Sequence, residues 1–190
     1  MGLRFFELLL KRRKAVVKER RRAARRDPFE GLVESTRLRQ SMDRRELEER
    51  VRELEVLEAD VQRHCGGSGR KAARRVAARN GLLECAVCEW PEGTDVFSLV
   101  QARGTEVLRV WSGKLVLTEH YYLRGRMVPY CVAELGAGTV VSMPPGMVYR
   151  VENRRRERAR TLHFLSPPPS ALPDSEGVRR LCEQSGVSVI

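Results

Sequence analysis

The sequence predicts a mainly β barrel preceded by N-terminal helices. After residue 81 the chain consists of short β-rich runs separated by glycine- and proline-containing turns, which is typical of a sandwich or barrel. Before that point, apolar residues instead recur three and four positions apart, as they do on one face of a helix. The 190 residues, 42% of them hydrophobic, suffice for one compact domain with an extension.

Four segments follow from this change of pattern. We expect a basic N-terminal extension at 1–40, a helical segment at 41–80 that packs on the barrel, and the barrel itself at 81–168. A C-terminal tail at 169–190 includes a short helix at 178–184. The five cysteines are odd in number and irregularly spaced, and no secretory signal precedes them, which predicts reduced thiols in an intracellular compartment.

The positive charge is concentrated in the extension. Residues 1–26 contain eleven lysines and arginines against two glutamates, a net charge of +9 out of +11 for the whole chain. Such an arm predicts a polyanionic partner, which is RNA, an anionic membrane surface or an acidic protein face. Its arginine-rich, acid-poor composition is also that of a mitochondrial transit peptide. No apolar stretch is long enough to span a bilayer.

Two basic clusters supply the candidate partner-binding residues. One is the helix-prone arm, which Asp27-Pro28 is expected to break, and the other is a loop between two predicted strands. For the loop, a solvated hairpin tip is an equal alternative. The candidates are Arg12, Arg13, Lys14, Arg20, Arg21, Arg22, Arg25, Arg26, Arg154, Arg155 and Arg156.

A helix is predicted from Asp43 to Arg63. Asp43 can cap it, with Glu46 three residues on as in a capping box. One apolar stripe then faces the barrel or, alternatively, a coiled-coil partner. The stripe consists of Leu47, Val51, Leu54, Leu57 and Val61. We also expect the basic stretch 71–79 to be helical.

Eight strands are predicted in the barrel segment. Trp111-Ser112-Gly113-Lys114 has the composition of a tight hairpin turn. The expected strands are 82–88, 96–100, 107–111, 114–122, 127–134, 139–142, 148–152 and 161–165.

The first of two glycine-bounded motifs begins at Gly93. Five residues separate it from Leu99-Val100-Gln101, Glu106 comes after four more, and Gly113 after a further six. Glycines at such positions set strand turns, so the spacing is needed whichever side chains lie between them.

The second motif begins at Gly138. Five residues separate it from Pro144-Pro145-Gly146, Tyr149 comes after two more, and Asn153 after a further three. Together the two motifs resemble the paired motifs of the cupin superfamily with every spacing kept. The resemblance implies a double-stranded β-helix, or jelly-roll, barrel.

The resemblance is closest to the cysteine dioxygenase (thiol dioxygenase) branch of that superfamily. Residues 149–153 read Tyr-Arg-Val-Glu-Asn and are similar to its His-Arg-Val-Glu-Asn, while residues 161–168 are similar to its Ser-Leu-His-Leu-Tyr-Ser-Pro-Pro. Trp90-Pro91-Glu92-Gly93 is similar to its Trp-Gly-Glu-Gly. The matching positions run from about Lys71 to Pro168, about half the chain.

The resemblance implies that this sequence has lost most of the residues with which that family binds its metal and substrate. In that family three histidines hold iron(II), an arginine binds the substrate carboxylate, and a Ser-His-Tyr relay lies beside the iron. The histidine positions are here Leu99, Gln101 and Tyr149, with the usual cupin glutamate kept as Glu106. The relay positions are Thr161, His163 and Leu165, and the substrate arginine falls near Ala73, with Arg74 and Arg75 adjacent. We therefore expect no catalytic residue, no metal and no cofactor.

Other histidines and cysteines give weaker signals. His163 is expected to face the core with a hydrogen-bond partner, and His64 and His120 to lie on the surface. Cys85 and Cys88 are three apart in a predicted strand, so their side chains point to opposite faces and are not expected to share a metal.

The favoured function is a non-catalytic cupin that serves as a structural subunit of a large, mitochondrial assembly of protein subunits, most simply a ribosome or other ribonucleoprotein contacted by the arm. One alternative is a peripheral subunit of a respiratory complex or ATP synthase, with the arm at a membrane interface. Another is a thiol dioxygenase with an altered metal site. A metal-free small-molecule sensor is a further possibility, for which no ligand is indicated.

Overall fold

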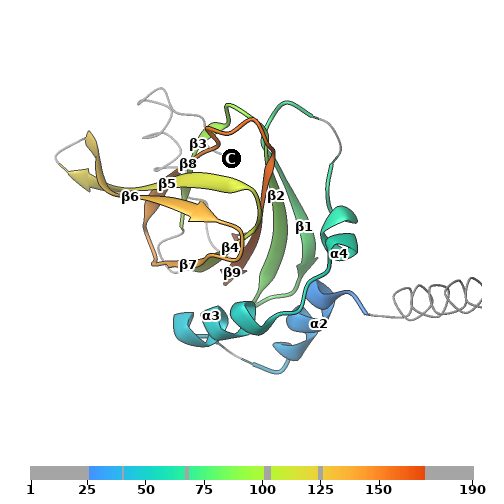
Figure 1. Ribbon diagram of the computed structural model, residues 1–190. Coiled ribbons are helices and arrows are strands. Elements are labelled where there is room, and N and C mark those ends of the chain that lie inside the picture. Colours follow the sequence, from blue (N-terminus) through green and yellow to red (C-terminus); the bar gives the residue numbers. More distant parts are fainter. Residues whose placement is uncertain (1–25, 40, 67–68, 101–103, 124–125, 170–190) are drawn as a thin grey trace, which may run out of the picture.

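The computed structural model describes residues 26–39, 41–66, 69–100, 104–123 and 126–169 (Figure 1). Within these ranges three helices precede nine strands. The helices are α2 (Pro28–Ser35), α3 (Arg44–Glu53) and α4 (Glu58–Gln62). The strands are β1 (Ala73–Arg79), β2 (Glu84–Trp90), β3 (Asp95–Leu99), β4 (Thr105–Ser112), β5 (Lys114–Leu123), β6 (Arg126–Gly136), β7 (Val140–Met143), β8 (Val148–Glu152) and β9 (Ala159–Ser166).

The strands form two antiparallel sheets. One has the order β1-β2-β9-β4-β7 and the other the order β3-β8-β5-β6. Apart from β1, successive strands from β2 to β9 are distributed between the sheets in the order of an eight-stranded jelly roll, with the last strands returning between the first ones. The mainly β barrel preceded by helices is therefore confirmed, and all eight predicted strands are present to within a few residues.

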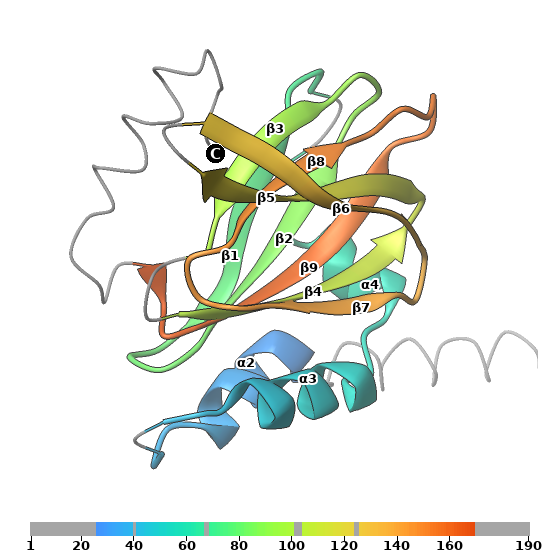
Figure 2. The same ribbon diagram turned by 90° about the vertical axis from the view of Figure 1, so that its left-hand side faces the viewer.

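The helices cover the outer face of the five-stranded sheet (Figure 2). Each helix buries apolar side chains there against Phe164 of β9. The fully buried ones are Phe29 of α2, Leu47 and Val51 of α3, and Val61 of α4. The predicted apolar stripe packs on the barrel through Leu47, Val51, Leu54 and Val61, whereas Val56 takes the buried place expected for Leu57. None of the described helices is both long and apolar enough to cross a membrane.

Asp27-Pro28 begins a helix as well as ending the arm. The Asp27 carboxylate accepts a hydrogen bond from the Phe29 N–H at 2.9 Å, and Pro28 occupies the first turn of α2, where its missing N–H costs nothing. Asp27 also contacts His64 Nε2 at 3.2 Å, at the end of the helical segment. The dipeptide thus fixes where the described helices start on the barrel.

The single helix predicted from 43 to 63 is wrong in its middle. The Asp43 cap is confirmed, because its carboxylate accepts the Glu46 N–H at 2.8 Å, but α3 ends at Glu53 and α4 starts at Glu58. Arg109 of β4 donates to the carbonyls of Val51 and Leu54 at 3.2 and 2.8 Å. A barrel side chain thereby satisfies carbonyls that a continuing helix would have used itself.

The helix expected at 71–79 is also wrong, because Ala73–Arg79 is strand β1. It pairs with β2 from Ala73 opposite Glu89 to Arg79 opposite Glu84. The alanines and arginines favour a helix intrinsically, but the free edge of β2 offers a ladder that no local preference can match. The segment 41–80 is therefore helical only in its first part.

The Trp111–Lys114 turn does not close a hairpin. β4 lies in the five-stranded sheet and β5 in the four-stranded one, so Gly113 is a corner where the chain passes between sheets. Its φ is 78°, and a Cβ placed on it would lie 2.8 Å from the Cα of Ala159. A glycine is therefore required both by the backbone conformation and by the close approach of β9.

Candidate functional site

The inner face of the five-stranded sheet carries a polar cluster. Along β9, Leu162 and Phe164 pack towards the helices, so Thr161 and His163, which alternate with them, face the barrel interior. Glu106 of β4 lies beside them, and all three polar residues are buried. Strand alternation therefore places the ionisable groups where the barrel is most enclosed.

Hydrogen bonds join this cluster into one chain. Trp90 Nε1–H donates to Thr161 Oγ1 at 2.7 Å, and Thr161 Oγ1 is 2.7 Å from His163 Nε2. His163 Nδ1 lies 2.5 Å from Glu106 Oε1, which also accepts the Tyr149 hydroxyl at 3.0 Å. Tyr149 belongs to β8 of the other sheet, so its side chain crosses the interior and ties the two sheets together.

Burial and neighbouring groups determine the protonation states of His163 and Tyr149 in this hydrogen-bonded cluster. Burial opposes protonation of His163, but Cys88 and Glu106 beside it outweigh that effect and raise its pKa to about 10. Both ring nitrogens then donate, Nε2–H to Thr161 and Nδ1–H to Glu106. Burial, together with the Glu106 carboxylate, raises the pKa of Tyr149 well above its usual range, so the phenol stays neutral.

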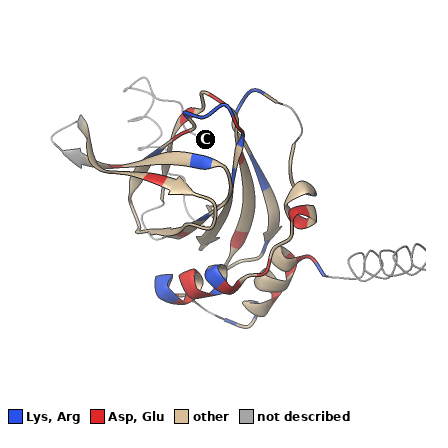
Figure 3. Ribbon diagram, viewed as in Figure 1, with Lys and Arg blue, Asp and Glu red and all other residues tan. Residues whose placement is uncertain are grey.

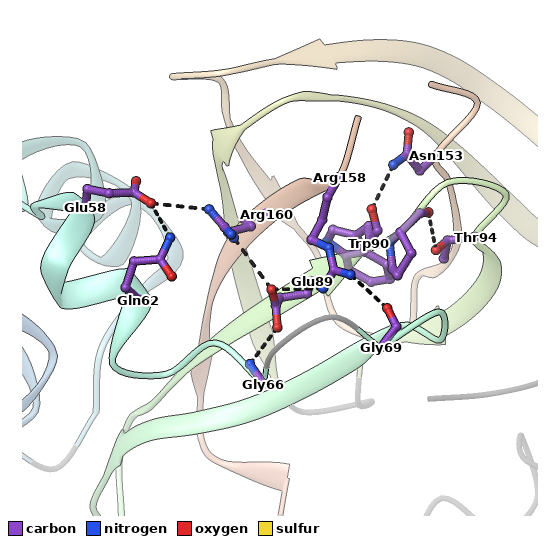
Figure 4. A network of polar contacts seen from close by, with 11 residues as sticks. Glu58, Gln62, Gly66, Gly69, Glu89, Trp90, Thr94, Asn153, Arg158 and Arg160 are labelled. Carbon is purple, nitrogen blue, oxygen red and sulfur yellow. Dashed lines mark hydrogen bonds and ion pairs between the residues drawn. The ribbon is translucent and has the colours of Figure 1, made fainter. Parts of the chain in front are cut away.

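The motif glycines lie in turns that connect the strands. Gly93, Gly113, Gly138 and Gly146 all have positive φ. Gly93 N–H donates to the Asn153 carbonyl at 3.0 Å, and the Asn153 amide donates to the Trp90 carbonyl at 2.7 Å (Figure 4). The first residue of one motif and the last residue of the other are therefore hydrogen-bonded, so the spacing of the two motifs has a structural role in this barrel.

Several solved structures are similar to part of this chain at low sequence identity. No protein-family model and no curated protein sequence matches the chain. An uncharacterised conserved protein with a double-stranded β-helix domain from Klebsiella pneumoniae is similar over 57% of this chain and 88% of its own, with 22% identity and a TM-score of 0.47. An RmlC-like cupin from Methanocaldococcus jannaschii is similar over 56% and 89%, with 12% identity and a TM-score of 0.43.

A cupin superfamily protein from Desulfitobacterium hafniense is similar over 55% of this chain and 84% of its own, with 12% identity and a TM-score of 0.42. These similarities are low, and the strand order with its positive-φ glycines decides the matter. The barrel has the double-stranded β-helix, or jelly-roll, fold that the resemblance to cupins predicts. The described helices α2, α3 and α4 pack on the outside of that barrel.

The positions where the resemblance puts metal ligands can be located in the cupin barrel only in part. Leu99 ends β3, where its backbone pairs with Val148, and Gln101 lies outside the described residues, as does the Leu99 side chain. Tyr149 and the retained Glu106 are in direct contact. Within the described ranges, no group of three or more histidine, cysteine, aspartate or glutamate side chains could hold a metal ion.

The relay positions lie side by side on β9, as their spacing predicts. Thr161 and His163 are hydrogen-bonded, whereas Leu165 is half-buried next to Glu106 and brings no polar group. Arg74, one residue beyond the position expected for the substrate arginine, lies opposite Cys88 on the inner face. Its guanidinium is paired with the buried Glu84 and not held free for a ligand.

Sequence reasoning missed two members of the cluster. Cys88 was placed on the opposite face from Cys85, which is confirmed by their separate packing, but its contact with His163 was not anticipated. The sequence motif gave Trp90 no role, although its indole N–H donates the first hydrogen bond of the cluster, to Thr161. Strand alternation would have put both on the inner face once the register against β9 was known.

The expectation that His64 and His120 lie on the surface is wrong. His120 is buried, with Nδ1 3.1 Å from the Thr118 carbonyl and its ring 5.0 Å from that of Phe97. His64 is partly buried against Phe29 and Asp27. Both residues pack at junctions between elements that their sequence neighbourhood does not reveal.

The arginine-rich loop between β8 and β9 is largely paired within the molecule. Arg154 contacts Glu152 at 3.0 Å and Arg155 contacts Glu134 at 3.2 Å. Arg156 lines a surface pocket of about 510 Å³ with Lys114 and Arg155. The loop therefore has less free positive charge than its sequence suggests. Of the arm candidates, Arg26 is exposed and the others lie outside the described residues.

A second polar network fastens the helical segment to the cupin barrel (Figure 4). Glu89 of β2 is buried, where it accepts the Gly66 N–H at 2.7 Å and contacts Arg158 at 3.2 Å. Arg160 lies between Glu58 of α4, at 3.3 Å, and Glu89, at 3.6 Å. Arg158 and Arg160, which belong to the basic stretch in the sequence, thus join α4 and the segment after it to β2.

Proposed function

We propose that this protein is a non-catalytic cupin, similar to thiol dioxygenases, that acts as a structural subunit of a large ribonucleoprotein assembly in mitochondria. The observation that carries the first half is the place of Tyr149. At a position where the resemblance expects a metal-binding histidine, a neutral phenol crosses the barrel and donates to Glu106. The interior position is thereby used to join the two sheets.

The donors around this position do not suit iron(II). Leucine has no donor atom, and a glutamine amide is a weak ligand compared with imidazole or carboxylate. Tyrosine binds a metal as phenolate, and the raised pKa of Tyr149 opposes its ionisation. Glu106 is already engaged by His163 and Tyr149. We therefore derive no reaction step through a metal at this site.

The engagement of Arg74 points the same way. A substrate carboxylate would need a free guanidinium on the inner face, and the guanidinium there is neutralised by Glu84. Removing Arg74 from that pair would leave the buried Glu84, among the residues that the structure describes, with the 3.4 Å contact to Arg79 alone. Its role in the barrel is thus structural.

The basic arm supports the second half of the proposal. A net charge of +9 over residues 1–26 is suited to phosphate contacts that need no base specificity. The remainder of the chain is close to neutral, so an assembly built on RNA would hold this subunit by the arm. The resemblance of the arm to a transit peptide favours the mitochondrial compartment.

Chemistry and partnership need separate tests. For chemistry, we expect the purified full chain to carry no stoichiometric iron and to consume no dioxygen with cysteine, as measured by elemental analysis and an oxygen electrode. Stoichiometric iron that is lost in Gln101→Ala and Tyr149→Ala would instead establish a thiol dioxygenase with an altered site.

For partnership, we expect the tagged protein from its native cells to sediment with a large particle and to be released by ribonuclease. Replacing Arg20, Arg21 and Arg22 with alanine should weaken this association, whereas the same change at the exposed Arg37, Arg44 and Arg45 should not. Release by detergent and not by ribonuclease would favour the membrane-complex alternative.

A further inference from the structure

A surface pocket of about 510 Å³ lies where three connections of the barrel meet. Its volume is within the range of pockets that hold small molecules. Its walls come from the β4–β5 corner, the turn after β6 and the loop between β8 and β9. Three lining side chains are cationic and one is anionic, so the pocket favours an anion. The lining residues are Gly113, Lys114, Ala137, Arg155, Arg156 and Glu157.

Hydrogen bonds of one buried side chain hold the loop between β8 and β9 in shape. Asn153 is buried, and its Oδ1 accepts the Arg155 N–H at 2.9 Å. The Asn153 amide donates to the Glu157 carbonyl at 2.9 Å and to the Trp90 carbonyl at 2.7 Å, and Figure 4 draws the second of these bonds. The loop arginines are therefore carried by an ordered backbone, which reduces the entropy that a ligand loses from the site on binding.

The other two walls of the pocket are also constrained. A Cβ at Gly113 would lie 2.8 Å from the Cα of Ala159, so the corner that carries Lys114 packs directly against the start of β9. In the turn after β6, Gly138 has a φ of 87° and its N–H donates to the Val110 carbonyl at 2.8 Å. All three walls thus have fixed backbones, and the shape of the pocket is formed before any ligand enters.

Two of the cations share one carboxylate. Lys114 Nζ is 3.3 Å from Glu134 Oε1, and Arg155 Nη2 is 3.2 Å from Glu134 Oε2. Figure 3 shows basic positions along the β8–β9 loop and at the start of β5, and an acidic position near the end of β6. Among the described residues, Glu134 lines a neighbouring pocket of about 210 Å³ and not the larger one. It therefore orients both cations without occupying the larger pocket.

Arg156 is the cation whose charge is not used inside the molecule. It is exposed, and within the described ranges its side chain makes no ion pair or hydrogen bond. A guanidinium presents two parallel N–H donors that match two oxygens of a phosphate group. With Lys114 and Arg155 beside it, the pocket has two such groups and one ammonium, which are the side chains that recognise phosphate.

We propose that this pocket binds a small phosphate monoester. The three positive charges and one negative charge of the lining match the dianion that a monoester forms near pH 7, since its second pKa is about 6. A phosphodiester in an RNA backbone has a single negative charge. No aromatic ring is among the described lining residues, so a nucleic-acid base has no stacking surface there. The pocket shares no residue with the arm or the inner cluster, and its binding is independent of the proposed function.

The test is isothermal titration calorimetry of the purified, nuclease-treated full chain with methyl phosphate and with dimethyl phosphate. An ionic strength of about 0.15 M screens the exposed charges of the arm. We expect methyl phosphate to bind with a Kd of about 1 mM or tighter, and dimethyl phosphate to bind at least about 10-fold more weakly. Failure to bind methyl phosphate at about 10 mM, or equal affinity for the two compounds, overturns the proposal.

Three variants test the assigned side chains. Arg156→Ala should raise the Kd for methyl phosphate at least about 10-fold, because it removes a charge-assisted contact to the ligand. Arg45→Ala is the matched control and should leave the Kd unchanged, because Arg45 of α3 is exposed and, in the part of the chain that the structure describes, also without an ion pair. Glu157→Gln should lower the Kd at least about 3-fold, because a like charge leaves the wall.

Circular dichroism of each variant checks that the barrel is folded. Equal weakening in Arg156→Ala and Arg45→Ala, or weaker binding in Glu157→Gln, contradicts the assignment of the pocket.

Oligouridylate without a terminal phosphate separates a small ligand from RNA. We expect its affinity to be the same in the wild-type chain and in Arg156→Ala, and to fall when Arg20, Arg21 and Arg22 are replaced with alanine. A loss in Arg156→Ala as large as that for methyl phosphate would assign the pocket to an RNA backbone and overturn the small ligand. Absence of RNA binding in the wild-type chain would contradict the proposed function alone, because the phosphate titration does not depend on it.

Discussion

The two faces of the five-stranded sheet are both buried but are filled in different ways. Towards the helices, Leu162 and Phe164 of β9 belong to a cluster of buried apolar side chains. Towards the interior, Thr161 and His163 of the same strand form a hydrogen-bonded chain with Glu106. Residues next to each other in the sequence therefore belong to environments with opposite requirements.

The difference teaches what each face can tolerate. On the helix side stability comes from burying apolar area and filling volume, so similar hydrophobic residues can replace one another at modest cost. On the inner side each buried polar group depends on its partner, and the loss of one leaves another without a hydrogen bond or a counter-charge. The polar residues of the inner face therefore stabilise the fold as a set, and replacing one of them destabilises the others.

The largest expected effect is from Glu106→Leu. It leaves the His163 imidazolium buried without its carboxylate and should lower the free energy of unfolding by about 3–5 kcal/mol, measured by urea denaturation. The double variant Glu106→Leu/His163→Leu removes both charges and should recover most of that loss, because apolar replacement of a whole buried pair is often neutral. A double variant as unstable as the single one would show that the two groups do not act as a pair.

On the helix side, Leu162→Ala should cost about 3 kcal/mol through the cavity it leaves among α2, α3 and the sheet. The measurement is the same urea titration, with Leu38→Ala as control because that side chain is 98% exposed. A loss below about 1 kcal/mol would mean that the helices do not seal this face as described.

Between about pH 6.5 and 10, stability should depend on pH chiefly through His163 on the inner face. His163 has a pKa of about 10 when folded, above the ordinary histidine value, so its contribution is complete below about pH 6.5 and is lost as the pH rises towards 10. The slope is at most about 1.4 kcal/mol per pH unit. Urea midpoints from pH 6 to 10 should fall in the wild-type chain and fall much less in Glu106→Leu/His163→Leu. Parallel curves would contradict the protonated state of His163.

The smallest effect is expected from Tyr149→Phe. It removes the hydroxyl that donates to Glu106 and keeps the ring that fills the barrel, so the loss should be about 1 kcal/mol. Tyr149→Ala, which also removes the ring, should cost several times more. Near-equal losses in the two variants would place the importance of Tyr149 in its hydroxyl and not in its volume.

Much of the fold and part of the site could be predicted from sequence. Glycine and proline spacing predicted the positions of the turns and the eight strands, though not that the chain changes sheets at Gly113, and two-residue alternation predicted that Cys85 and Cys88 face apart. The partners of His163 could not be predicted, because Glu106 comes from β4 and Cys88 and Trp90 come from β2, and only strand pairing establishes the register of both against β9. Strand β1 was missed for the same reason, since its local preference is helical and its pairing is not local.

The sequence by itself determined the jelly-roll barrel and the turns that need glycine, and it put Leu99, Gln101 and Tyr149 at the positions where the resemblance implies histidine. Only the tertiary structure decided what Tyr149 does in that place, that Arg74 is bound by Glu84, and that the loop arginines are mostly paired. The physical reason is how far apart in the sequence the interacting residues lie. Turn geometry and strand alternation are set by neighbouring residues, whereas charge pairing and exposure depend on residues that come together only when both sheets have closed.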